Sequence, residues 1–167
     1  MNDLDNLEGK IVGTLETVSD QIKTLLGGRK EWTRSLKDAL GCLGREQGFE
    51  ICASGYPGAQ EGEWLYDMSW VVLDRDNYGS LKRLAVVVES EWAPDPQLDG
   101  DFQKLVQARA DIRVWIFISA NGAEVRNYIA RCKKQVELFQ GSISGDRYIF
   151  VGFDWAEKGV QIERFQL

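Results

Sequence analysis

The chain has 167 residues, of which 44% are hydrophobic and 28% are charged, so it has the composition and the length of a globular protein with one substantial core. It contains no histidine and only three cysteines, which excludes Ser-His and Cys-His nucleophiles and argues against a zinc site. The net charge of −6 argues against indiscriminate DNA binding over the whole surface. No apolar run approaches the roughly 20 residues of a membrane span. The acidic start MNDLDNLEGK lacks the apolar segment of a secretory signal, so we expect a cytoplasmic protein without disulfides.

Two helices are predicted at the start of the chain. Residues 1–28 carry apolar side chains at steps of three and four, which indicates one amphipathic helix that ends at Gly27 and Gly28. This helix either packs on the rest of the chain or pairs with a second copy as a homodimer, and the sequence leaves both open. A second helix is predicted at about 31–47. Residues 29–167 are expected to form a single α/β domain.

Strands and helices alternate over the rest of the chain. Strands are predicted at 49–54, 64–74, 81–91, 113–119, 148–153 and 160–165, with helices at about 98–110 and 121–139. Strands that follow one another directly in the chain favour antiparallel pairing. Strands separated by a helix favour parallel pairing through a crossover connection. The fold class predicted is therefore α/β, with a mixed central sheet flanked by helices and preceded by the N-terminal amphipathic helix.

The strand predicted at 81–91 ends in two glutamates one residue apart, in the sequence LAVVVESEW. Residues i and i+2 of a strand point the same way, so Glu89 and Glu91 are expected on one face. In the preceding strand, Asp67 lies among large apolar residues, at a distance from the connecting loop comparable to that of Glu89. The three carboxylates are therefore expected to converge, and Mg²⁺ or Mn²⁺ is the cation that oxygen ligands of this kind prefer. The alternative is that the glutamates are solvated and Asp67 is a hydrogen-bonded structural residue.

The order of these elements resembles the PD-(D/E)XK nuclease superfamily, which has the restriction-endonuclease-like fold, over about residues 30–155. The resemblance rests on Asp67 in one strand, VVVE ending in Glu89 at the close of the next strand, and a helix directly after it. It implies that Asp67 and Glu89 bind Mg²⁺ or Mn²⁺. It also implies phosphodiester hydrolysis of nucleic acid, with DNA expected ahead of RNA.

The chain departs from the family at the third position of the motif, where most members have lysine and this chain has Glu91. A minority of type II restriction endonucleases carry glutamate there, so the resemblance implies that Glu91 orients or deprotonates the attacking water. Alternatively, Lys104 on the following helix takes the place of the motif lysine. Its position on that helix, nearly opposite the apolar Phe102 and Leu105, slightly favours a solvated lysine instead. Family members often add a glutamate from an upstream helix, for which Glu31 and Glu46 are the candidates.

The sequence is therefore compatible with two functions. The first is a metal-dependent nuclease that uses the four side chains Asp67, Glu89, Glu91 and Lys104. The second is a catalytically inactive, nuclease-like binding or regulatory subunit, which the missing motif lysine and the acidic net charge favour.

Overall fold

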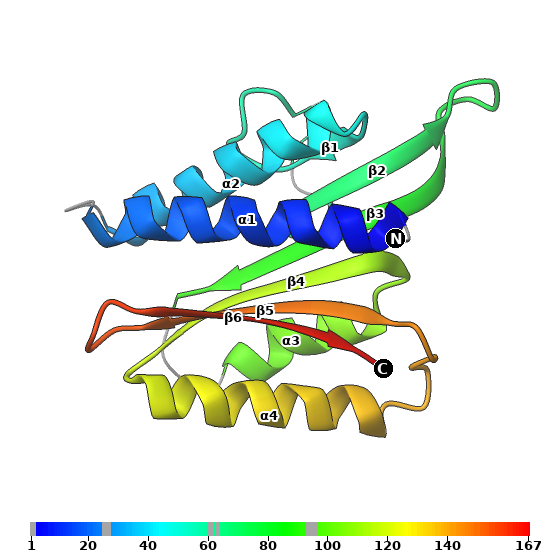
Figure 1. The fold of residues 1–167 in the computed structure, drawn as a ribbon. Helices are drawn as coiled ribbons and strands as arrows, with labels where there is room; N and C mark the ends of the chain where they lie inside the picture. Colours follow the sequence, from blue (N-terminus) through cyan, green and yellow to red (C-terminus); the bar gives the residue numbers. More distant parts are fainter. Residues whose placement is uncertain (1–2, 25–27, 60–61, 63, 93–96) are drawn as a thin grey trace. The chain divides into compact units, whose positions relative to one another are not determined.

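The computed structural model describes residues 3–24, 28–59, 62, 64–92 and 97–167. In this part of the chain there are four helices and six strands, which confirms the prediction of an α/β protein with the N-terminal helix first (Figure 1). Their bounds are α1 (Asp3–Thr24), α2 (Arg29–Glu46), β1 (Glu50–Cys52), β2 (Met68–Asp74), β3 (Ser80–Glu91), α3 (Gln97–Gln107), β4 (Ala110–Ser119), α4 (Gly122–Leu138), β5 (Arg147–Asp154) and β6 (Val160–Gln166). The strands follow one another in chain order in a mixed sheet. No helix among the described residues is both long enough and apolar enough to cross a membrane.

The chain divides into two compact units, Met1–Val87 and Val88–Leu167. The first unit contains α1, α2, β1, β2 and most of β3. The second contains the end of β3 and all of α3, β4, α4, β5 and β6.

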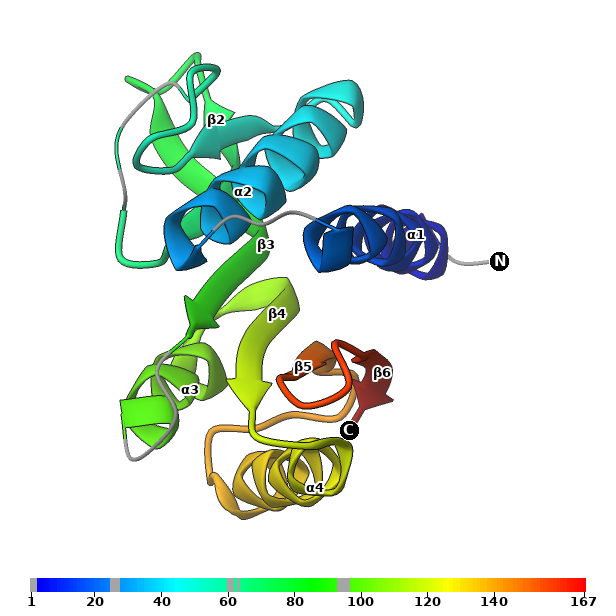
Figure 2. The ribbon, with the colours of Figure 1, turned by 90° about the vertical axis from the view of Figure 1, so that its left-hand side faces the viewer.

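In the first unit, helices α1 and α2 lie side by side (Figures 1 and 2). The apolar stripe of α1 is buried at Leu7, Ile11, Leu15 and Val18, as its spacing predicts. Near the end of α2, the ammonium of Lys10 donates a hydrogen bond of 2.6 Å to the side-chain oxygen of Gln47. Of the two roles expected for the first helix, packing within the chain is therefore observed.

Strand β2 begins later than the sequence predicts. It pairs with β1 in antiparallel register, with Ile51 opposite Trp70, but its first residue is Met68 rather than Trp64. Leu65 has a φ of 65°, in the left-handed region, which an extended strand does not allow. The prediction that 64–67 belongs to this strand is therefore wrong, and Asp67 lies in a bend directly before β2.

In the second unit, β5 lies between a parallel and an antiparallel neighbour. It pairs with β4 from Arg147 to Asp154 in parallel register, and with β6 in antiparallel register. All of its residues are buried, as in an internal strand covered on both faces. Helices α3 and α4 contact each other and lie on the same side of these strands (Figures 1 and 2).

The α4 helix starts where the sequence predicts. The side-chain oxygen of Asn121 accepts hydrogen bonds of 3.0 Å from the backbone amides of Ala123 and Glu124, which is the usual arrangement of an N-cap. The helix then runs along β5 and reaches Leu138, in agreement with the predicted range.

Candidate active site at the end of strand β3

Strand β3 carries Glu89 into a buried position. The strand is buried on both faces from Ala85 to Glu89, and Glu89 is only 5% exposed. The strand continues to Glu91, which is half-buried, so the two glutamates occupy alternate strand positions as the sequence predicts. A carboxylate buried to this degree costs free energy unless a cation or hydrogen bonds stabilise it.

Helix α3 supplies the cation. The Nζ atom of Lys104 lies 3.5 Å from Oε1 of Glu89 and 2.7 Å from Oδ1 of Asp101. The side chain of Lys104 is 52% exposed and that of Glu89 is 7% exposed, so the pair joins a solvent-facing ammonium to a buried acid. The sequence slightly favoured a solvated Lys104. The structure leaves the side chain of Lys104 half exposed and also brings its ammonium to Glu89.

The aromatic core of the second unit determines how α3 is rotated about its axis. Phe102 and Leu105 are both fully buried, and the ring of Phe102 contacts those of Trp115, Tyr148 and Phe150. With these residues pointing at the strands, Lys104 lies on a flank of the helix. A long lysine stem can reach sideways from such a flank, so a helical angle away from the core does not exclude contact with a strand-end acid.

The charge pattern around Lys104 stabilises its ammonium form. The hydrogen bond to Asp101 raises the pKa of Lys104 above its ordinary value, and the negative charge of Glu89 acts in the same direction, while partial burial opposes both. Lys104 is therefore a cation at neutral pH, suited to contacting a negatively charged oxygen rather than to removing a proton.

Asp101 is not among the site residues predicted from the sequence. A signal for it was present, because Asp101 and Lys104 are three residues apart in a predicted helix, and such pairs of opposite charge face each other.

Asp67, the expected partner of Glu89, lies in the first unit and is half-buried in the bend before β2. The two upstream glutamates are also in this unit. Glu31 accepts a hydrogen bond of 2.8 Å from the backbone amide of Gly28 and so caps its own helix. Glu46 is exposed and lines a cavity of about 640 Å³ between α1 and α2.

The described residues supply oxygen donors suited to a hard cation but hold no complete metal site. The carboxylate of Glu89 already faces a positive charge, that of the Lys104 ammonium, and carboxylates are the ligands that Mg²⁺ and Mn²⁺ prefer. Within the described ranges, no three or more Asp, Glu or Cys side chains gather in a group that could bind a metal ion.

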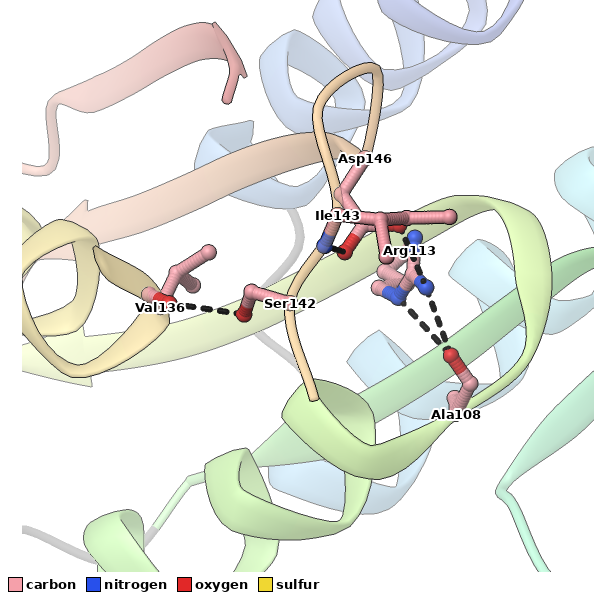
Figure 3. A network of polar contacts seen from close by, with 6 residues as sticks. All are labelled: Ala108, Arg113, Val136, Ser142, Ile143 and Asp146. Carbon is pink, nitrogen blue, oxygen red and sulfur yellow. Dashed lines mark hydrogen bonds and ion pairs between the residues drawn. The ribbon is translucent and has the colours of Figure 1, made fainter. Parts of the chain in front are cut away.

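A second polar cluster holds the other end of α3 (Figure 3). Arg113 donates two hydrogen bonds, of 3.1 and 2.6 Å, to the backbone oxygen of Ala108, directly after the helix. Its guanidinium also forms a buried ion pair of 3.0 Å with Asp146, whose other oxygen accepts a hydrogen bond from the amide of Ile143. These contacts tie the end of α3 to the α4–β5 loop and so limit the movement of the helix that carries Lys104.

No protein-family model, curated protein or solved structure matches this chain.

Proposed function

We propose that this protein is a metal-dependent nuclease of the PD-(D/E)XK type, hydrolysing phosphodiester bonds of nucleic acid, with DNA expected ahead of RNA. One observation carries the proposal: a buried strand-end acid, Glu89, lies 3.5 Å from a lysine delivered by the next helix. The order of the elements from α2 to α3 supports it, because a helix, three strands and a helix are the order of elements on which the resemblance rests.

Each side chain has a separate role in this proposal. Asp67 and Glu89 would hold Mg²⁺ or Mn²⁺, which when bound acts as a Lewis acid toward the phosphate. Lys104 contributes a positive charge close to the phosphate oxygens, where negative charge increases in the transition state. Glu91 orients the attacking water or accepts its proton.

The second candidate is a nuclease-like binding or regulatory subunit without catalysis. Glu91 at the position where most family members have lysine, together with the net charge of −6, favours it. In this case Lys104 and Glu89 form an ion pair that stabilises the end of β3 and has no substrate.

Cleavage assays separate the two candidates. Plasmid DNA, single-stranded DNA and RNA are incubated with Mn²⁺ and with the wild type, Glu89→Gln or Lys104→Met. We expect the wild type to cleave at least one substrate, and each variant to lose about 100-fold or more in rate because it loses one electrostatic contact to the reacting group.

Lys134→Met is the matched control, because Lys134 is also an exposed helical lysine paired with a carboxylate three residues away, at 3.1 Å from Glu137. It is expected to retain full activity. If a correctly folded wild type cleaves none of the three substrates, the subunit hypothesis replaces the nuclease.

A further inference from the structure

We propose that Asp101 is a positioning residue that holds the ammonium of Lys104 beside Glu89. The inference rests on the proposed nuclease function for its purpose, but the contact itself is a property of the second unit alone. It assigns a role to a residue that is expected neither to bind the metal nor to touch the substrate.

The distances show which acid holds the lysine. The Nζ atom is 2.7 Å from Oδ1 of Asp101, a normal length for a charge-assisted hydrogen bond, and 3.5 Å from Oε1 of Glu89, which is too long for a strong one. The short contact to Asp101 therefore defines the position of the ammonium, and Glu89 faces an ammonium that is already held.

Lys104 needs such a partner because half of its side chain is exposed. An exposed lysine with four rotatable bonds samples many rotamers, and holding it in one of them costs side-chain entropy. A single long contact with Glu89 offsets little of that cost. Asp101, on the same helix, restricts the lysine without ordering any further backbone, because the backbone of α3 is already helical.

The support beneath Asp101 is rigid. Phe102, the next residue, is fully buried among three aromatic rings, and Arg113 holds the end of the helix through Ala108. Asp101 itself is 29% exposed in its side chain, so it is partly shielded from solvent. Lys104 would thus keep one carboxylate partner when Glu89 is engaged as a metal ligand.

The first test observes the lysine directly. In nitrogen-detected NMR of lysine ammonium groups, a held ammonium exchanges its protons with water slowly enough to give a signal, whereas a mobile exposed one does not. We expect a Lys104 signal, assigned by its loss in Lys104→Arg, that disappears in Asp101→Asn and persists in Glu137→Gln. The latter is the matched control because it removes the corresponding acid from Lys134 on α4. A Lys104 signal that is unchanged in Asp101→Asn overturns the proposal.

The second test uses cleavage kinetics. We expect Asp101→Asn to lower kcat by about 10- to 100-fold with KM changed less than two-fold, because a misplaced catalytic group slows the chemical step. Asp101→Glu restores the carboxylate and should recover most of kcat, which a purely structural role would not require. Equal kcat in the wild type and Asp101→Asn overturns the positioning role.

The two proposals can fail separately. If the wild type cleaves nothing but the Lys104 signal depends on Asp101, the nuclease proposal fails and the positioning contact stands. Thermal unfolding of each variant verifies that Asp101→Asn is folded in both tests.

Discussion

At the scale of single residues, burial changes the pKa of a tyrosine in the second unit. Tyr148 is fully buried, and the guanidinium of Arg113 lies over its ring at 5.1 Å from the centroid. Desolvation by burial raises the pKa of Tyr148 to about 12, although the charge of Arg113 opposes this shift. A tyrosine that resists ionisation in the folded protein makes stability depend on pH.

We predict that the protein loses stability between about pH 10 and pH 12 in part because of Tyr148. In this range the unfolded chain has released the phenolic proton while the folded protein still binds it, so rising pH favours unfolding. Below pH 10, Tyr148 makes its full contribution to the free energy of unfolding. Between pH 10 and pH 12 this contribution falls by on the order of 2–3 kcal/mol.

Urea unfolding at pH 9, 10 and 11 measures this effect. Tyr148→Phe should flatten the decline relative to the wild type. Tyr78→Phe removes a fully exposed tyrosine and serves as the control, with the wild-type slope expected. A slope that is the same in all three proteins would contradict the assignment.

At the scale of elements, glycine determines how closely α2 approaches its strands. A Cβ atom on Gly44 would lie 2.6 Å from Cδ1 of Ile51 and 2.7 Å from Cε2 of Trp70, and Trp70 is fully buried. The glycine therefore permits close packing of α2 on these side chains, despite its cost in helix propensity.

Two glycine substitutions are predicted to change the free energy of unfolding in opposite directions. Gly44→Ala should lower the free energy of unfolding by about 1–3 kcal/mol, since the methyl group overpacks against Ile51 and Trp70. Gly9→Ala in α1 should raise it by up to about 1 kcal/mol, because a Cβ there meets no atom within 4 Å and alanine favours the helix. Urea denaturation of both variants gives the two values, and a neutral Gly44→Ala would show that α2 can shift without cost.

At the scale of the whole molecule, the proposed metal ligands come from different parts of the chain. Asp67 precedes β2 in the first unit, and Glu89 lies near the end of β3 in the second. The nuclease proposal requires both carboxylates for one cation, so each is predicted to be essential on its own.

Calorimetric titration with Mn²⁺ tests that requirement. We expect the wild type to bind the ion and both Asp67→Asn and Glu89→Gln to lose at least ten-fold in affinity, since each removes a charged oxygen ligand. Asp76→Asn, which neutralises an exposed aspartate in the β2–β3 loop, should bind like the wild type. Mn²⁺ binding that is unaffected by Asp67→Asn would remove the nuclease proposal.

The sequence alone determined the type and order of the elements. Periodic apolar positions predicted α1 and α2, the run RVWIFIS predicted the buried part of β4, and Asn121 marked the start of α4 to within one residue. These predictions succeed because helix and strand periods, caps and breakers act over a few neighbouring residues. The predicted start of β2, Trp64, lies four residues before the observed start, Met68. The alternation of apolar residues does not reveal that the backbone of Leu65 is in the left-handed region.

Only the tertiary structure decided which side chains meet. The contact of Lys104 with Glu89, and the role of Asp101 in holding it, depend on how Phe102 rotates α3 against the aromatic residues of β4 and β5. The same holds for α1, whose apolar stripe was evident but whose partner was not. A sequence pattern specifies which face of an element is apolar, whereas the position of a charged group at the edge of that face depends on packing between residues distant in the chain.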